Sequence, residues 1–194
     1  AAGFLGEGAT AGELGAAILS AFGLSPLPET TGRLPVQTAR AELEWAGRVQ
    51  AGILPEKPPA LPGWDIAAVL EPARETSGDF YDFIPFPDGK IAIIVGDVTD
   101  KGVPAALVMA TTRSILRSAS ESSQSPGEIL ARVNDLLCPD IPAKMFVTCM
   151  YMVLDPETGK LQIANAGHNL PCQRTDQGII EQRVTGMPLG LMEG

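Results

Sequence analysis

This sequence is poor in the residues and motifs that mark several common protein classes. It has three cysteines, Cys138, Cys149 and Cys172, and their spacing matches neither a disulfide framework nor a zinc site. We therefore expect reduced thiols in a cytoplasmic protein. No apolar run reaches the roughly 18 residues needed to cross a bilayer, and no secretory signal opens the chain. Neither a GxGxxG pattern nor a Walker motif occurs, which disfavours dinucleotide binding and P-loop chemistry.

Positive charge is also scarce. The 194 residues include 14 Lys and Arg against 23 Asp and Glu, which gives a net charge of −9 and a pI near 4.6. Such an acidic chain is a poor partner for nucleic acid or for an anionic membrane surface, so we expect neither. The same charge favours a protein that attracts divalent cations, and the length suffices for one domain with a sizeable core.

What the sequence does contain is a pair of acidic motifs on either side of an expected β-hairpin. The motifs are Ser77-Gly78-Asp79-Phe80-Tyr81-Asp82 and Gly96-Asp97-Val98-Thr99-Asp100-Lys101-Gly102. Pro87-Asp88-Gly89, between two apolar runs, is typical of a three-residue loop in which Gly89 has a positive φ. In that register Phe86 pairs with Lys90, and Asp79 lies directly opposite Asp97.

Two carboxylates that face each other across a hairpin repel one another. At about 4 Å the repulsion is about 4 kcal/mol for an effective dielectric constant near 20. A divalent cation between the carboxylates, or a shared proton, removes it, so the pattern predicts a metal site at Asp79 and Asp97. The competing interpretation treats both as surface residues at strand ends and turns. A two-residue turn would place them on opposite faces of the hairpin.

The rest of the chain divides into a short extension and one domain. Residues 1–36 are rich in Gly and Ala, contain a short amphipathic helix that starts at Thr10, and end in a Pro-containing stretch typical of a linker. Because the chain does not start with Met, we expect this extension to follow an upstream module. Residues 37–194 are predicted to form the domain.

Within the domain, hydrophobic periodicity predicts an α+β fold. We expect a helix over 37–54, a first strand over 65–70, and then the two strands of the hairpin. One helix should begin near Pro104, and a second should begin at a capping box formed by Ser125 and Glu128. Further strands are expected over 146–154, 161–166 and 179–184. Long antiparallel strands interrupted by two consecutive helices indicate helices stacked on a sheet.

These motifs, in this order, resemble the catalytic domain of the SpoIIE/RsbU-like branch of the PPM (type 2C) metal-dependent serine/threonine phosphatases. The match begins with the helix over 46–55 and includes both acidic motifs. It continues with Phe146-Val147-Thr148, Asn165-Ala166-Gly167-His168-Asn169 and Gly186-Met187-Pro188-Leu189-Gly190. The resemblance implies an αββα sandwich, in which two antiparallel sheets lie between helical layers and metal ions bind at one end of the sheets.

The resemblance also assigns roles to individual residues. It implies that Asp79, Asp97 and the carbonyl oxygen of Val98 bind a pair of Mn²⁺ or Mg²⁺ ions, with Gly78 and Asp100 in supporting positions. The reaction it implies is hydrolysis of phosphoserine or phosphothreonine by a metal-activated water. Missing motifs agree with this route, since the sequence has no Cys-x5-Arg loop and no Gly-x-Ser-x-Gly elbow.

Other polar residues near the motifs have alternative interpretations. Arg74 falls where type 2C relatives place a phosphate-contacting arginine, but a plain surface residue is the alternative. His168 is either a general acid or a structural residue that hydrogen-bonds a turn backbone, and we favour the structural role. Asp100 either contacts a water near the metal or caps the helix after it, and we favour the cap. Asp82 and Asp88 are interpreted as strand-end and turn residues.

The resembling domains continue past Gly-x-Pro-Leu-Gly to a Thr-Asp-Gly motif whose aspartate completes the metal site, whereas this sequence stops at Gly194. We therefore expect an incomplete domain that binds one ion or none. One hypothesis is a phosphatase that acts on a phosphorylated anti-anti-sigma (STAS-domain) protein in bacterial partner switching, behind an upstream sensor or receiver domain. The other is a signalling module that binds without catalysis. A homodimer is left open, and a calcium-stabilised domain is disfavoured because no EF-hand spacing occurs.

Overall fold

The computed structural model describes residues 36–193, so the helix expected to start at Thr10 lies outside the described part. The chain divides near residue 40, and all the described strands belong to the unit of residues 40–194. In chain order the elements are α2 (Val36–Ile53), β1 (Phe80–Pro85), β2 (Ile91–Val98), α3 (Val103–Ser120), α4 (Pro126–Leu137), β3 (Val147–Leu154), β4 (Leu161–Ala166), β5 (Cys172–Thr175) and β6 (Gly178–Glu181). None of the described helices is both long enough and apolar enough to cross a membrane.

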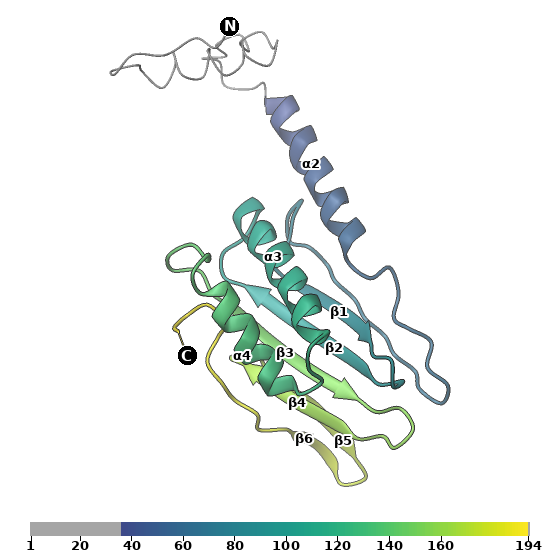
Figure 1. The fold of residues 1–194 in the computed structure, drawn as a ribbon. Helices are drawn as coiled ribbons and strands as arrows, with labels where there is room; N and C mark the ends of the chain where they lie inside the picture. Colours follow the sequence, from purple (N-terminus) through teal and green to yellow (C-terminus); the bar gives the residue numbers. More distant parts are fainter. Residues whose placement is uncertain (1–35, 194) are drawn as a thin grey trace, which may run out of the picture. The chain divides into compact units, whose positions relative to one another are not determined.

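Strands β1 to β4 form one antiparallel sheet in the order β1-β2-β3-β4. Helices α3 and α4, which connect β2 to β3, lie across one face of this sheet (Figure 1). Strands β5 and β6 form a separate two-stranded hairpin. The predicted α+β class, with consecutive helices stacked on antiparallel strands, is therefore confirmed. The described residues supply one large sheet and one helical layer.

The hairpin of β1 and β2 has the predicted register. The backbone N–H of Phe86 donates to the carbonyl of Lys90 at 2.9 Å, and that of Gly89 donates to the carbonyl of Phe86 at 3.1 Å. Gly89 has a φ of +85°, as the three-residue loop requires. The ladder ends with Phe80 opposite Gly96, so the next pair outward is Asp79 and Asp97.

Successive side chains along each strand point to opposite faces of the sheet. Buried side chains on one face pack against α3 and α4 and form the main core, which includes Phe80, Ile94, Val98, Tyr151, Met109, Leu116, Ile129 and Val133. A smaller cluster of Phe83, Ile91 and Leu154 covers part of the other face, together with Leu61 and Ile66. Because Val98 points into the main core, its neighbour Asp97 lies on the face away from the helices.

A buried ion pair joins β1 to α3. Asp82 is 0 % exposed, and its carboxylate accepts hydrogen bonds from Arg117 at 2.7 and 2.8 Å and from the backbone of Phe83 at 2.9 Å. The Nε of Arg113 lies 3.0 Å from the same carboxylate. The interpretation of Asp82 as an ordinary strand-end residue was therefore wrong. The ion pair connects β1, which includes part of the first acidic motif, to α3, which follows the second acidic motif.

The expected first strand over 65–70 is absent as a strand from the described residues, which explains why only two strands precede α3. The segment is apolar enough to be extended, yet no neighbouring strand pairs with it, and Val69 is 81 % exposed. Near the end of the chain the prediction was also imprecise. Strand β6 ends at Glu181 rather than at residue 184, and β5 was not predicted.

Helix α4 begins after Ser125, as predicted, but neither of the predicted side-chain caps forms. Ser125 makes no side-chain cap bond to α4, and Glu128 accepts a hydrogen bond from Ser123 at 2.8 Å instead. Asp100 has a φ of +75°, and the residue that precedes α3 is Gly102, which also provides no side-chain cap. The left-handed backbone of the loop leaves Asp100 upstream of the position from which a side chain caps a helix.

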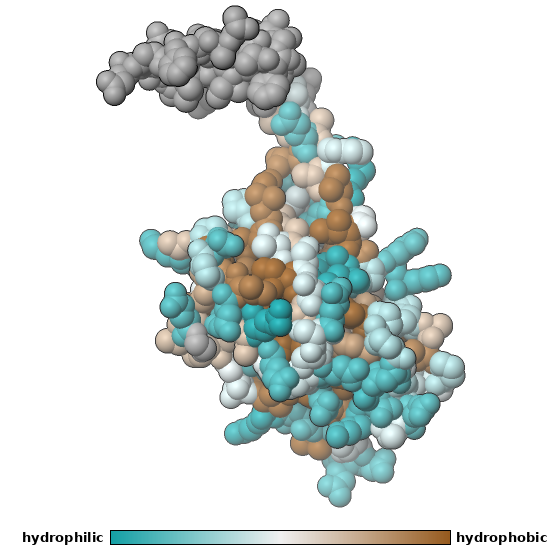
Figure 2. All heavy atoms as spheres, viewed as in Figure 1, coloured by the Kyte–Doolittle hydropathy of each residue, from teal (hydrophilic) through white to brown (hydrophobic). Residues whose placement is uncertain are grey.

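Apolar side chains remain exposed on two helices. The exposed apolar residues are Leu43, Trp45 and Val49 on α2, and Val103 and Leu107 on α3. Figure 2 shows apolar (brown) atoms over α2 and the first turns of α3. Scattered apolar residues are normal on a protein surface, whereas a group of them on neighbouring turns is a candidate contact area.

Replacing Asp82 by Asn should lower the free energy of unfolding by about 2–3 kcal/mol. Removing one partner of a buried ion pair costs about 3–5 kcal/mol, and the 44 % exposure of Arg117 places this pair below that range. The matched control is Asp88→Asn, which breaks the exposed 2.6 Å pair with Lys90 and should have a much smaller effect, because solvent screens an exposed ion pair. Urea unfolding followed by circular dichroism measures both. Equal effects of the two substitutions would contradict the proposed contribution of Asp82.

Candidate metal centre

Four polar residues form a row across one end of the large sheet. Asp79 precedes β1 and lies opposite Asp97 at the end of β2, and Asp97 is in turn paired with Thr148 on β3. His168 comes after β4, and its Nδ1 lies 2.9 Å from the hydroxyl oxygen of Thr148. The register thus gathers residues from four segments of the sequence on the face away from α3 and α4.

The two aspartates interact electrostatically. Partial burial raises the pKa of Asp97, and the negative charge of Asp79 and a hydrogen bond with Asp79 raise it further. The hairpin register places the two side chains next to each other on one face of the sheet, as predicted. Both side chains belong to exposed residues, so a cation can reach them. Two adjacent carboxylates are the hard oxygen donors that Mn²⁺ and Mg²⁺ prefer, and the pair fits one such ion.

The ligand set is small. Within residues 36–193, no group of three or more His, Cys, Asp or Glu side chains is arranged to hold a metal ion. The number and charge of the ligands set the affinity of such a site, so two carboxylates alone should bind a divalent ion weakly.

Gly78 and Val98 pack closely beside the aspartates. The backbone N–H of Val98 lies 3.4 Å from the carbonyl oxygen of Gly78. A Cβ on Gly78 would lie only 2.8 Å from the carbonyl oxygen of Val98 and 3.2 Å from the Cβ of Ala105. A side chain at position 78 would therefore displace the carbonyl that the sequence suggested as a ligand.

Helix α2 fixes the backbone of the first acidic motif through hydrogen bonds. The Gln50 side chain donates to the carbonyl of Ser77 at 2.7 Å and accepts from its N–H at 2.8 Å. The hydroxyl of Ser77 in turn accepts from the N–H of Asp79 at 3.0 Å. Gly47 lies so close to Glu75 that a Cβ there would overlap the Glu75 carbonyl oxygen. Sequence reasoning missed Gln50, because a contact across 27 residues leaves no local pattern.

Arg74 lies beside the second acidic motif. Its Nη1 is 3.9 Å from the position that a Cβ on Gly102 would occupy, at the N-terminus of α3. Arg74 is exposed. An exposed guanidinium next to a helix N-terminus makes the end of the second acidic motif, at Gly102, electropositive.

His168 is fixed in place by its own turn. The Asn165 side chain accepts from the N–H of His168 at 2.7 Å and donates to its carbonyl at 2.9 Å. Burial lowers the pKa of His168, while the charge of Asp79 acts in the opposite direction. The expectation that the His168 ring hydrogen-bonds the turn backbone was wrong, because Asn165 does this and the imidazole contacts Thr148.

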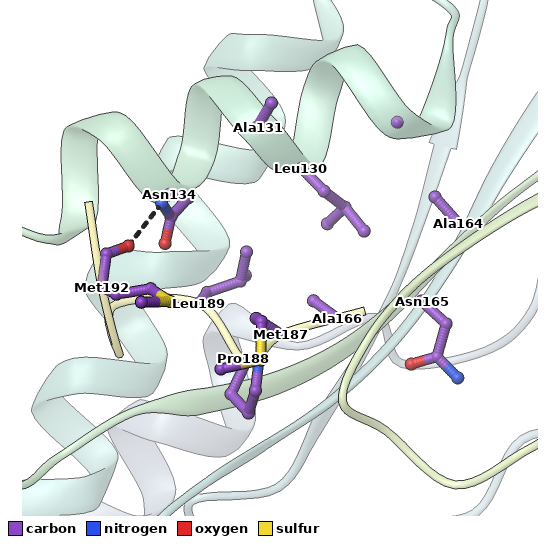
Figure 3. A pocket seen from close by; sticks show the side chains of 11 residues that line it. Leu130, Ala131, Asn134, Ala164, Asn165, Ala166, Met187, Pro188, Leu189 and Met192 are labelled. Carbon is purple, nitrogen blue, oxygen red and sulfur yellow. Dashed lines mark hydrogen bonds between the residues drawn. The ribbon is translucent and has the colours of Figure 1, made fainter. Parts of the chain in front are cut away.

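The segment after residue 186 packs against the turn from Asn165 to His168. Gly167 has a φ of +70°, and a Cβ there would lie 2.7 Å from the Pro188 ring. The Asn134 side chain on α4 donates to the carbonyl of Met192 at 3.0 Å and accepts from the N–H of Gly190 at 2.9 Å. Figure 3 shows Asn134 beside Met192, at the edge of a cavity of about 330 Å³ that is lined mainly by apolar side chains.

Comparison with known proteins identifies a family and several relatives that this chain resembles. A family model described as Stage II sporulation protein E (SpoIIE) matches residues 87–194. Protein IcfG of Synechocystis sp. is 35 % identical over 182 residues, which cover 79 % of this chain and 28 % of that protein. Phosphoserine phosphatase RsbU of Bacillus subtilis is 29 % identical over 178 residues, which cover 91 % of this chain and 53 % of that protein. The chain thus spans between about a quarter and a half of these relatives' lengths.

A solved structure shares the fold. The SiaA-PP2C domain of Pseudomonas aeruginosa superposes with a TM-score of 0.64 at 20 % sequence identity, covering 81 % of this chain and 65 % of that one. Identity at this level shows the fold alone. It confirms that the sheet and its helical layer are those of the PP2C-type sandwich.

Replacing Asp97 by Asn should stabilise the metal-free protein. The raised pKa of Asp97 means that folding favours its protonated form, so the repulsion develops as the pH rises through this pKa and persists at neutral pH. Removing a like charge directly opposite another contributes about 0.2–1 kcal/mol, or up to about 4 °C in melting temperature. Thermal unfolding in EDTA at pH 7.5 measures this gain.

In millimolar Mn²⁺ the order of the two proteins should reverse, because an ion that binds only the folded wild-type protein raises its stability. Asp88→Asn, remote from the pair, is the control and should respond to Mn²⁺ as the wild type does. A lower melting temperature for Asp97→Asn in EDTA, or an equal response to Mn²⁺, would contradict the assignment of the pair.

Proposed function

This chain belongs to the SpoIIE family, and from that premise we propose that it hydrolyses phosphoserine or phosphothreonine in a protein through a metal site at Asp79 and Asp97. The observation that carries the proposal is the β1–β2 register, whose last pair, Phe80 and Gly96, makes Asp79 and Asp97 the next residues to face each other. The name of the relative RsbU, a phosphoserine phosphatase, supports the same reaction.

Each residue of the site has a distinct task in this proposal. Asp79 and Asp97 hold the metal, and the Val98 carbonyl adds a neutral oxygen, for which Gly78 leaves room. When bound, Mn²⁺ or Mg²⁺ supplies a water that ionises near neutral pH and positive charge for the phosphoryl oxygens. Arg74 orients the phosphoryl group from the α3 side, since a guanidinium matches two of its oxygens. Asp100, in the loop after Asp97, remains a proposed supporting residue.

The second candidate is a module that keeps the fold for binding and has lost catalysis. The observation in its favour is that the described residues offer two carboxylates and no third metal-binding side chain beside them. Calorimetric titration with Mn²⁺ separates the two functions. A saturable heat that disappears in Asp79→Asn favours the enzyme, and no heat at millimolar Mn²⁺ favours the binding module.

We propose as substrate a small phosphorylated regulator, an anti-anti-sigma (STAS-domain) protein of a partner-switching pathway in the bacterial cytoplasm. Residues 1–36 would connect the phosphatase domain, residues 37–194, to an upstream sensor or receiver domain. The greater length of both relatives supports such a fusion. The exposed apolar side chains of α2 and α3 suit a homodimer contact (Figure 2). Light scattering with Val49→Asp tests that contact.

Hydrolysis of p-nitrophenyl phosphate in Mn²⁺ should fall about hundredfold or more when Asp97 is replaced by Asn, because the charge that holds the ion is lost. The assay is run on residues 1–194 and on a chain extended at the C-terminus. Asp88→Asn, an acidic loop residue with the same charge change, should retain full activity. Activity that survives Asp97→Asn while depending on Mn²⁺ would reject the proposed ligand.

Replacing Arg74 by Ala should raise KM for a phosphoserine peptide about tenfold, which corresponds to one charged hydrogen bond at an exposed site. The dissociation constant for Mn²⁺ should stay within about twofold of wild type, because Arg74 contacts the substrate and not the metal. Arg174→Ala on the exposed strand β5 is the control and should leave both values unchanged. An unchanged KM in Arg74→Ala would mean that Arg74 is a plain surface residue that does not contact the substrate.

A further inference from the structure

We propose that His168 binds the phosphoryl group of the substrate through its Nε2 atom, an inference that rests on the phosphatase function proposed above. His168 is the single histidine of the chain. The register places it at the end of the row Asp79–Asp97–Thr148, and so on the same face of the sheet as the two aspartates.

Position is the first argument. His168 and Asp79 line the same cavity of about 450 Å³, together with apolar residues of β1, β2 and the segment 66–71. They are its polar members along with Glu71 and the Tyr81 hydroxyl, and that hydroxyl donates to the Pro55 carbonyl at 3.1 Å. The imidazole contacts Thr148, the residue paired with Asp97, so it lies next to the aspartate pair.

Rigidity is the second argument. Both backbone polar groups of His168 are bonded to Asn165, at 2.7 and 2.9 Å, and the preceding Gly167 packs against Pro188. The ring itself is anchored at Nδ1, 2.9 Å from the Thr148 hydroxyl oxygen, whereas that oxygen is 3.4 Å from the Asp97 carbonyl. A side chain held at its backbone and at one ring nitrogen is oriented before any ligand arrives.

The remaining nitrogen is the third argument. Across residues 36–193, Nε2 of His168 makes no hydrogen bond, although the residue is half-buried. The 2.9 Å contact between Nδ1 and the Thr148 hydroxyl is shorter than the 3.4 Å contact of that hydroxyl with the Asp97 carbonyl. When the hydroxyl donates to Nδ1, the neutral imidazole carries its proton on Nε2 and donates it outward. A phosphoryl oxygen is a strong acceptor for such a donor. Mn²⁺ and Mg²⁺ prefer oxygen ligands, which assigns Nε2 to the substrate rather than to the metal.

The direct test is nuclear magnetic resonance of protein labelled with ¹⁵N-histidine, because one histidine gives one imidazole. The probe is a phosphonate analogue of a phosphoserine peptide, added in the presence of Mg²⁺. We expect Nε2 to shift saturably on addition of the peptide, with a much smaller change at Nδ1. Unchanged resonances for both nitrogens at saturating peptide would overturn the proposal.

Two matched substitutions separate binding from positioning. Asn reaches about as far as Nδ1 and can keep the contact with Thr148, whereas Gln reaches about as far as Nε2. We expect His168→Asn to weaken peptide binding about ten- to hundredfold, and His168→Gln to recover most of that loss. The dissociation constant for Mg²⁺ should stay within about twofold in both. Recovery by Asn but not by Gln, or a matching loss of Mg²⁺ affinity, would overturn the substrate contact in favour of a positioning role.

These readouts do not depend on turnover. A saturable Nε2 shift in a protein that fails to hydrolyse phosphopeptides would reject the proposed catalysis and keep the phosphoryl contact. Normal hydrolysis with no Nε2 shift would reject the phosphoryl contact of His168 and keep the proposed catalysis.

Discussion

The repulsion between Asp79 and Asp97 is the constraint on which the rest of the site depends, and the β1–β2 hairpin enforces it. A loop of three residues closed by Gly89 fixes a register in which the carboxylates face each other on one side of the sheet. A loop one residue shorter would separate them to opposite faces. Partial burial and the neighbouring charge of Asp79 both raise the pKa of Asp97, as expected for two carboxylates placed side by side. An arrangement of this kind is stable at neutral pH when a divalent cation or a proton lies between the two groups.

The surrounding structure keeps the strand ends from relaxing that contact. Gln50 fixes the backbone of Ser77, whose hydroxyl accepts a hydrogen bond from the backbone of Asp79. Asp82, three residues after Asp79, is buried and joins β1 to α3 through Arg117. On the other side of the pair, the turn at Asn165 fixes His168 against Thr148. The Gln50–Ser77, Arg117–Asp82 and Thr148–His168 hydrogen bonds connect segments far apart in the sequence, so the site is assembled by the fold and not by any one motif. Rigid supports of this kind orient polar groups before a substrate binds.

The sequence predicted best where the signal was local. Hydrophobic periodicity and turn residues identified α2, α3, α4 and the strands of the large sheet, and the Pro87-Asp88-Gly89 loop predicted the register of the aspartates. Prediction failed where the outcome depended on distant partners. The segment 65–70 has the composition of a strand, but no described strand pairs with it. The burial of Asp82 required two arginines more than 30 residues away. Gln50 and the Thr148–His168 contact were invisible for the same reason.

The most direct test of the account is a crystal structure of the protein with Mn²⁺, with data collected at the manganese absorption edge. The account predicts an anomalous difference peak between the carboxylates of Asp79 and Asp97, within coordination distance of an oxygen from each. The same crystals of Asp97→Asn should lose that peak. Two carboxylates that point into separate spaces, with Mn²⁺ bound elsewhere or not at all, would contradict the central claim.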